Sequence, residues 1–270
     1  MYSVIYHCVF KNFLFTTMTA PQRHNEILKL LETRENLDVM TLGELLGVSA
    51  VTIRKDLRLL EEKGLLFRTH GGASRHNPYI RDRNVIEKEQ LFPEEKAKIA
   101  AAAARYVAPN DSIIVASGTS MQALAKELVH KPPLTVITSS LYVSQILIQC
   151  NSIQVIQLGG VLRHSSGSVS GFQAENFLDT VVCSTLFLGA DGIDLTHGIT
   201  TTDLSEARLN QKMIEASESV IVLADSSKFS RHGFGKICGF DVVSRIITDD
   251  KIPGKIAKQL EDMGVAIEIA

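Results

Sequence analysis

Five apolar runs after residue 93 are each followed by small, hydroxyl-bearing or charged residues. The first run, 112–116, is followed by Ser117, Gly118, Thr119 and Ser120, which open a predicted helix. The free N–H groups and the positive dipole end of such a helix attract phosphate groups. This string therefore predicts a phosphate-binding loop.

The residues after the other four runs suit the rest of an anionic, hydroxyl-rich ligand. Arg163 or Lys228 could neutralise a phosphate, and Asp191 could accept hydrogen bonds from sugar hydroxyls. The residues after any one run, taken alone, are typical of an ordinary strand-to-helix turn. Parallel strands, however, bring their carboxyl ends to one edge of the sheet, where ligands bind. The predicted ligand-binding residues are Ser117, Gly118, Thr119, Ser120, Ser139, Ser140, Gly159, Gly160, Arg163, Asp191, Gly192 and Lys228.

A second group of residues lies on a predicted helix, 50–63, whose cations gather on one side. Ile53 marks the apolar face, Lys55 and Arg58 lie nearly opposite it, and Asp56 beside it is interpreted as an internal ion-pair or capping residue. Arg and Lys on such a face can bind guanine or phosphate in the major groove, or can serve solubility alone. The predicted DNA-binding residues are Ser49, Thr52, Arg54, Lys55, Arg58, Arg68 and His70.

The segments around this helix complete a predicted DNA-binding module. Apolar spacing predicts helices over 22–33 and 41–46, and Gly47 suits the end of the second helix. Ser49 suits the N-cap of the helix that follows, because its hydroxyl can accept free N–H groups. Residues 65–73 predict a short hairpin with cations near a Gly-Gly turn, which is typical of the wing of a winged helix-turn-helix.

From residue 93 onward, predicted strands alternate with predicted helices. Continuously apolar, β-branched strands indicate a mostly parallel sheet covered on both faces. The sequence thus predicts a mainly α winged helix-turn-helix followed by an α/β domain. The predicted strands are 112–116, 134–138, 153–158, 185–188, 220–224 and 245–248, and the helices are 94–107, 120–129, 141–149, 205–217 and 253–263.

The predicted organisation has four segments. We expect residues 1–18 to be a disordered or non-native extension, because the organised sequence begins after Met18. A DNA-binding domain, 19–74, is followed by a polar linker, 75–92, and by an effector domain, 93–270.

Composition excludes several classes of protein. With 45% hydrophobic and 21% charged residues, the chain is typical of a globular protein, and its net charge of −2 indicates no particular partner. The four cysteines lie far apart, which argues against a zinc site or disulfides and fits a reducing cytoplasm. No apolar run approaches the ~20 residues of a membrane span. No dinucleotide or nucleoside triphosphate motif is present, and we expect no cofactor and no metal.

A spaced string of residues runs through the N-terminal module: Arg23-x3-Ile27-x3-Leu31-x17-Ser49-x2-Thr52-Ile53-Arg54-Lys55-Asp56-Leu57. It resembles the helix-turn-helix signature of the DeoR family of bacterial sugar-operon repressors, and the following EEKGLLFRTHGGA resembles that family's wing. The resemblance implies that this module binds DNA.

Five strings after residue 93 also resemble this family: SGTS (117–120), LGGVLR (158–163), FLGADGID (187–194), GITT (198–201) and ADSSKF (224–229). The family's sensor looks like the ribose-5-phosphate isomerase and glucosamine-phosphate deaminase fold. The stretch SEARLNQKM is most similar to members that respond to amino-sugar or hexitol phosphates.

Two positions depart from the family's pattern. The family usually has Asp directly before the SGT loop, where this chain has Ala116, and Asn-Glu after the GITT turn, where it has Asp203 and Leu204. Each departure removes a carboxylate from, or near, the predicted pocket, which leaves open whether ligand binding is weakened or redirected.

The resemblance implies a transcriptional regulator that represses a carbohydrate-catabolism operon until a phosphorylated sugar releases it. The expected partners are operator DNA, the sugar phosphate and further copies of the chain, in a dimer or a tetramer. The alternative is a sugar-phosphate isomerase or deaminase with an added DNA-binding head. Such an enzyme needs a general base, for which Asp191 and Asp225 are candidates, but the loss of carboxylates at Ala116 and Leu204 argues against it.

Overall fold

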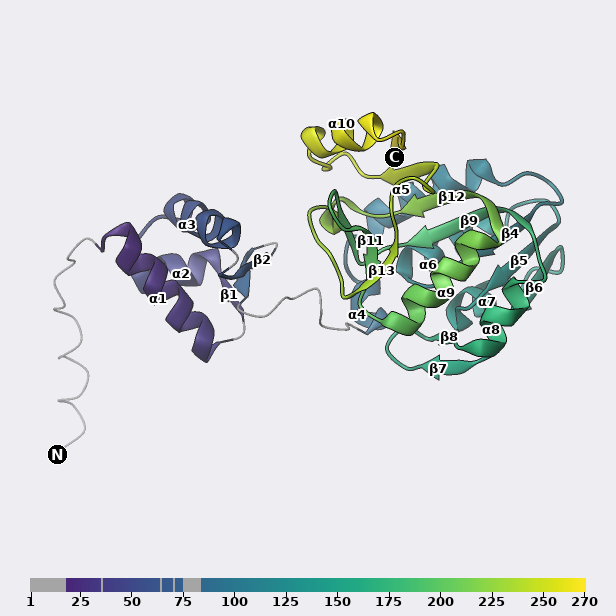
Figure 1. Cartoon of the computed structure of the whole chain (residues 1–270), viewed down its shortest axis with the longest axis horizontal. Helices are drawn as coiled ribbons and strands as arrows, with labels where there is room; N and C mark the ends of the chain where they lie inside the picture. Colours follow the sequence, from purple (N-terminus) through teal and green to yellow (C-terminus); the bar gives the residue numbers. More distant parts are fainter. Residues whose placement is uncertain (1–17, 35, 64, 70, 75–83) are drawn as a thin grey trace. The chain divides into compact units, whose positions relative to one another are not determined.

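The chain forms two compact units, residues 1–78 and residues 79–270, each with its own hydrophobic core. The structure, a computed structural model, describes residues 18–270 except 35, 64, 70 and 75–83 (Figure 1). Most of the predicted extension and part of the predicted linker lie outside the described residues. The predicted domain boundaries stay predictions.

The first unit packs three helices around a small apolar core. Ile27, Leu42 and Ile53, one from each helix, are fully buried there. Asp38 caps the second helix and Ser49 caps the third, each by accepting a backbone N–H with its side chain. The elements are α1 (Ala20–Thr33), β1 (Asn36–Asp38), α2 (Val39–Leu46), α3 (Ala50–Glu62), β2 (Phe67–Thr69) and β3 (Gly72–Ser74).

The predicted hairpin is present as β2 and β3, and β1 adds a third strand that the sequence analysis missed. The strands pair antiparallel in the order β1-β3-β2. Glycine is required at position 72, where β3 pairs with β1, because a Cβ there would lie 1.9 Å from the carbonyl oxygen of Leu37. The unit is therefore a winged helix-turn-helix, as predicted.

The second unit is built on a seven-stranded sheet in which every pairing is parallel. Its order is β15-β14-β12-β9-β4-β5-β6, so the connections reverse direction between β4 and β9. The strands are β4 (Ser112–Val115), β5 (Leu134–Thr138), β6 (Ile153–Gln157), β9 (Cys183–Gly189), β12 (Ser217–Leu223), β14 (Arg245–Thr248) and β15 (Ala266–Ile269).

Helices flank this sheet (Figure 1). α5, α6 and α7 pack side by side, whereas α8 packs on α9 and α10 packs on β15. Right-handed crossovers place helices on opposite faces once the chain reverses its direction along the sheet. The helices are α5 (Pro93–Ala103), the short η1 (Ala104–Tyr106), α6 (Thr119–Leu128), α7 (Leu141–Leu147), α8 (Phe172–Leu178), α9 (Leu204–Glu215) and α10 (Gly254–Asp262).

Smaller elements gather around the sheet. The hairpin β7–β8 and the antiparallel sheet β10-β11-β13 stand apart from the parallel sheet. The elements are α4 (Val85–Glu89), β7 (Val161–Arg163), β8 (Ser168–Ser170), β10 (Gly192–Asp194), β11 (Gly198–Thr201), η2 (Ser226–Lys228) and β13 (Gly235–Cys238). The predicted fold class is confirmed, and no helix in the described part of the chain is long and apolar enough to cross a membrane.

Candidate functional site

A pocket lies at the carboxyl end of the sheet, beside the neighbouring strands β4 and β9. Ligands of open α/β sheets bind at the carboxyl edge where the connections reverse, and this pair of strands is that place. The pocket is lined by Val85, Lys88, Lys96, Ser117, Gly118, Thr119, Ser120, Arg163, Ser165, Ser166, Gly189, Ala190, Asp191, Thr201, Glu206 and Lys228.

The loop after β4 brings unsatisfied donors to the pocket. α6 begins at Thr119, and within the described chain no side chain caps this end of the helix. The N-cap, Gly118, has a φ of 115°, a backbone conformation that residues other than glycine rarely adopt. The first turn of α6 therefore offers free N–H groups and its positive dipole end to an anion.

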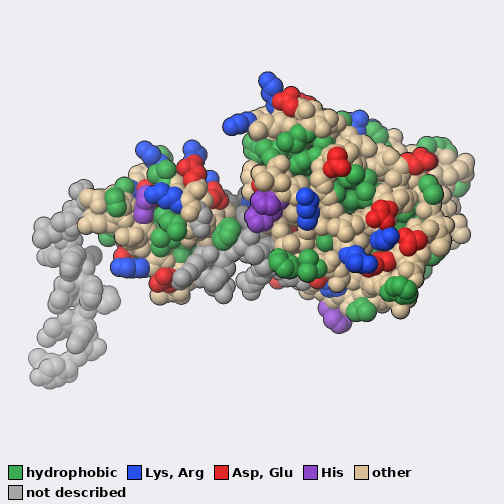
Figure 2. All heavy atoms as spheres, viewed as in Figure 1, with side chains coloured by type: hydrophobic (Ala, Val, Ile, Leu, Met, Phe, Trp, Pro, Cys, Tyr) green, Lys and Arg blue, Asp and Glu red, His purple; other side chains and the backbone are tan. Residues whose placement is uncertain are grey.

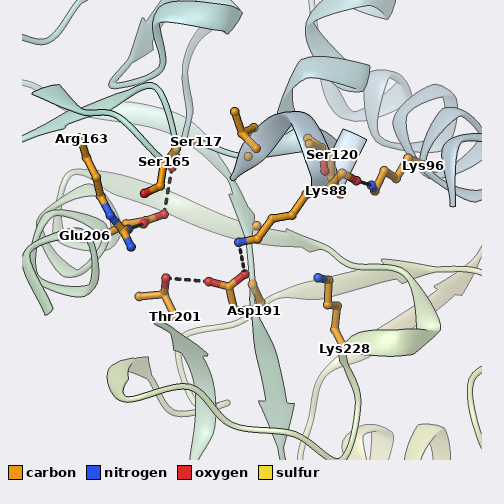
Figure 3. A pocket seen from close by; sticks show the side chains of 16 residues that line it. Lys88, Lys96, Ser117, Ser120, Arg163, Ser165, Asp191, Thr201, Glu206 and Lys228 are labelled. Carbon is orange, nitrogen blue, oxygen red and sulfur yellow. Dashed lines mark hydrogen bonds and ion pairs between the residues drawn. The ribbon is translucent and has the colours of Figure 1, made fainter. Parts of the chain in front are cut away.

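Three lysines approach the pocket from different elements: Lys88 from α4, Lys96 from α5 and Lys228 from η2. Figure 3 shows Lys88 and Lys228 pointing toward the space beside Asp191. Among the described residues, the ammonium of Lys228 has no hydrogen bond and no ion-pair partner within contact distance. Burial lowers the pKa of Lys228, against the opposing charges of Asp191 and Asp225.

Lys96 has only 6% of its surface exposed. Its ammonium donates to the carbonyl oxygens of Lys88, at 2.6 Å, and Leu91, at 2.5 Å. Burial lowers the pKa of Lys96 to about 8, although the charge of Asp225 opposes the shift. Most of it is still protonated at pH 7. The pocket lining thus carries four cations and two carboxylates, an excess of two positive charges: Lys88, Lys96, Arg163 and Lys228 against Asp191 and Glu206.

Asp191 follows β9 and stays ionised. Burial alone raises the pKa of Asp191, but the charges of Lys88 and Lys228, with hydrogen bonds from Lys88 and Thr201, outweigh it and lower the pKa to about 2. One carboxylate oxygen accepts from Lys88 at 2.8 Å, and the other accepts from the Thr201 hydroxyl at 3.1 Å and the Thr202 backbone N–H at 3.3 Å. A carboxylate with so low a pKa is a poor general base.

The other side of the pocket holds a second charged group. Glu206, in the first turn of α9, accepts from Arg163 at 2.6 Å and from the Ser117 hydroxyl at 3.0 Å. Burial raises the pKa of Glu206, as does the charge of Asp191, while the charge of Arg163 lowers it. In Figure 3, Glu206 and Arg163 lie on the opposite side of Asp191 from Lys228. The pocket therefore has a cationic side and a side with mixed donors and acceptors.

The candidate DNA-binding surface lies on α3 of the first unit. Arg54, Lys55 and Arg58 are exposed, and Figure 2 shows Lys and Arg side chains along the side of the unit where α3 lies. The Ser49 hydroxyl accepts the backbone N–H of Thr52 at 3.2 Å, and the two hydroxyls lie 3.0 Å apart. This end of α3 is therefore held in one position while its cations project into solvent.

Asp56, on the buried side of α3, is the internal ion-pair partner that the sequence indicated. It accepts two hydrogen bonds from the Arg23 guanidinium and lies 3.0 Å from the ring of His24, both on α1. Burial raises the pKa of Asp56, but Arg23 and His24 outweigh it, so the net shift is downward. This ion pair fixes α3 against α1.

The wing adds one described cation to this surface. Arg68, on β2, lies 3.7 Å from the carboxylate of Glu61. Arg68 and Arg54 line one pocket together with Asp38, Val39, Met40, Leu57, Thr69, Gly71 and Gly72. His70, which we also predicted to contact DNA, lies outside the described residues.

Two family models match the chain. The DeoR-like helix-turn-helix domain matches residues 23–78, and the DeoR C terminal sensor domain matches residues 92–250, more than half of the sequence. The chain belongs to the DeoR family.

Relatives of this DeoR-family chain have names that describe regulation. A relative from Escherichia coli that is named for the aga operon is 34% identical over 249 residues, covering 91% of this chain and 92% of the relative. The glycerol-3-phosphate regulon repressor of Escherichia coli is 30% identical over 252 residues, covering 93% and 100%. The ribose 5-phosphate isomerase A structure from Methanocaldococcus jannaschii is 17% identical with a TM-score of 0.39, covering 51% and 54%. The chain is a DNA-binding transcriptional regulator and not an enzyme.

Seven of the twelve predicted ligand residues line the regulator's pocket, and five do not. Ser139 and Ser140 are buried after β5, where the Ser140 hydroxyl caps α7. Gly160 lies against the Ser170 carbonyl, and Gly192 lies against Arg231 in the small antiparallel sheet. Gly159 and Gly160 follow β6, the edge strand, two strands away from the reversal point. The pocket forms at the reversal point and not along the whole sheet edge.

The two departures from the DeoR pattern lie outside the pocket lining. Ala116 is buried directly after β4, and Leu204 is 57% exposed. Glu206, which the sequence analysis did not select, supplies a carboxylate two residues after Leu204. Lys88 and Lys96 were also missed. The only signal for these three residues was charge within predicted helical or linker sequence, which is typical of solvated surface.

Proposed function

We propose that the pocket beside β4 and β9 binds a phosphorylated sugar. One observation carries this proposal: Lys228, unpartnered within the described chain, lines the same pocket as the uncapped start of α6. A phosphate monoester carries about −1.5 to −2 charges at pH 7, which offsets the pocket's excess of two positive charges. Glu206, Arg163 and Ser117 supply donors and acceptors for sugar hydroxyls on the other side. One relative is named for glycerol-3-phosphate, which is also a phosphate monoester.

A thermal-shift screen of sugar phosphates tests this proposal. A ligand present at 100 times its Kd stabilises the folded state by about 2.7 kcal/mol. We expect at least one sugar phosphate to raise the Tm, whereas the matching unphosphorylated sugar does not. An equal shift with the unphosphorylated sugar would contradict a phosphate site.

We further propose that α3 enters the major groove of an operator. In this arrangement Arg54, Lys55 and Arg58 contact bases or phosphates, Ser49 and Thr52 contact the backbone, and Arg68 on the wing contacts a neighbouring phosphate. Two copies of the chain bind half-sites about one DNA turn, or a multiple of it, apart, within a dimer or a tetramer. The regulator acts in the cytoplasm, where operator DNA lies.

Linkage between the two sites defines the regulatory cycle that we propose. The sugar phosphate binds the DNA-free form more tightly than the DNA-bound form, so it releases the operator. The operator affinity of the purified chain, measured with and without the sugar phosphate found in the screen, tests this sign. An operator complex that becomes tighter with ligand would reverse it.

A further inference from the structure

α4 (Val85–Glu89) is the first described element after residues 75–83, through which the chain passes from the DNA-binding unit to the sensor unit. This helix is more than a connection, because Val85 and Lys88 both line the pocket. A ligand in the pocket therefore lies beside the segment that leads to the DNA-binding unit.

Hydrogen bonds and ion pairs hold α4 against its neighbours. The backbone N–H of Val85 donates to the Ser165 carbonyl at 2.7 Å, and the Lys88 carbonyl accepts from Lys96 at 2.6 Å. Two ion pairs join α4 to other elements. Lys88 pairs with Asp191 inside the pocket, whereas Glu89 pairs with Lys126 on α6 at 3.8 Å on the exposed surface.

Three cations lie close together on the pocket side of α4. Lys88, Lys96 and Lys228 line the same pocket. The positive charges of Lys88 and Lys228 help to lower the pKa of Lys96, and that of Lys88 helps to lower the pKa of Lys228. Asp191 is the one carboxylate that bonds Lys88 among the described residues, and it also accepts from Thr201. Like charges repel one another in a site that is shielded from water, and a bound anion removes this repulsion.

We propose that an anion bound between Lys88 and Lys228 fastens α4 to the carboxyl edge of the sheet. The anion attracts the Lys88 ammonium on α4 while it contacts Lys228 and the start of α6. This inference rests on the proposed anion site, and it makes Lys88 the residue through which the ligand acts on the segment leading to the DNA-binding unit. Ligand binding then restricts the motion of α4.

Hydrogen–deuterium exchange of the full chain with inorganic phosphate tests this role of Lys88, with chloride at matched ionic strength as the reference. In the wild type, phosphate should slow exchange at the start of α6 and across α4, by about fivefold or more in α4. In Lys88→Ala the slowing in α4 should disappear, while that at the start of α6 remains. Lys88→Arg keeps the positive charge and should restore it.

Lys126→Ala is the matched control, because it removes the exposed ion pair of α4 and leaves the pocket unchanged. In this variant, phosphate should still slow exchange both at the start of α6 and across α4. Exchange in β4 and β9 reports whether the sheet is folded in each variant.

Two results would overturn the inference while the anion site stands: a response in α6 without one in α4, or an undiminished α4 response in Lys88→Ala. If saturating phosphate changes exchange in neither segment, the anion site itself is wrong, and this inference falls with it.

Discussion

The two units use Lys and Arg under opposite conditions. On α3, Arg54, Lys55 and Arg58 project into solvent, whereas Lys96 and Lys228 are buried enough for their pKa values to fall. Exposed cations keep their charge and are screened by salt, which suits a long polyanion such as DNA. Buried cations are costly unless they are paired, so they favour a ligand that brings its own negative charge. The same residue types thus serve two kinds of recognition.

The largest effect is expected where a buried ion pair in the first unit is broken. Asp56→Ala leaves the Arg23 guanidinium buried without its partner, which should destabilise this unit by about 3–5 kcal/mol. Calorimetry should show a lower melting transition for the first unit and an unchanged one for the sensor unit. Glu26→Ala, which removes an exposed ion pair with Lys29, is the control and should have little effect. Equal shifts in both transitions would contradict separate cores.

The next largest effect is expected in the sensor pocket. Lys228→Ala should weaken sugar-phosphate binding by about 2–5 kcal/mol, because a desolvated charge contact with the phosphate is lost. Isothermal titration calorimetry measures this loss, and operator affinity without ligand should not change. Lys236→Ala, an exposed lysine on β13, is the control. Equal affinities in Lys228→Ala and Lys236→Ala would remove Lys228 from the site.

A smaller effect is expected on the exposed surface of α3. Arg54→Ala or Lys55→Ala should weaken operator binding by about 1–3 kcal/mol if the side chain contacts a base. Fluorescence anisotropy over a series of salt concentrations separates the two roles, since loss of a phosphate contact lowers the salt slope by about one. Lys29→Ala on α1 is the control. Loss of sugar-phosphate binding in either α3 variant would indicate misfolding instead of lost DNA contact.

The smallest effect concerns pH. The pKa of Lys96 is about 8 and that of Lys228 is also lowered, so the pocket loses positive charge as pH rises above 8. Sugar-phosphate affinity should therefore fall between pH 7 and pH 9, by up to roughly tenfold per pH unit above 8. The charge of Asp191 does not change over this range, and the phosphate becomes only slightly more negative, which would favour binding. Lys96→Met should flatten the profile, and a wild-type affinity that rises with pH would contradict the assignment.

Much of the fold was predictable because its central strands are continuous apolar runs. β5 and β14 have the predicted bounds, and the other predicted strands differ by a few residues at their ends. Some short elements were not predicted, for a physical reason. β11 is buried along its whole length and shows no alternation, and α4 has five residues, too few to display a helical period.

The candidate site was predictable only where strand ends supply it. Ser117–Ser120, Asp191 and Lys228 follow strands and line the pocket. Lys88, Lys96 and Glu206 come from helices, and only the fold brings them to the same place. The order of strands in the sheet cannot be derived from a single sequence, so the reversal between β4 and β9 could not be located in advance.

Operator release by a sugar phosphate tests the central claim most directly. The measurement is the fluorescence anisotropy of a labelled operator fragment, selected from genomic DNA with the purified chain and titrated with the sugar phosphate that raises its Tm. We predict that the wild type releases the fragment, whereas Lys228→Ala binds it equally well but stays bound at the same ligand concentration. A sugar phosphate that saturates the wild-type pocket and leaves operator affinity unchanged would contradict the account.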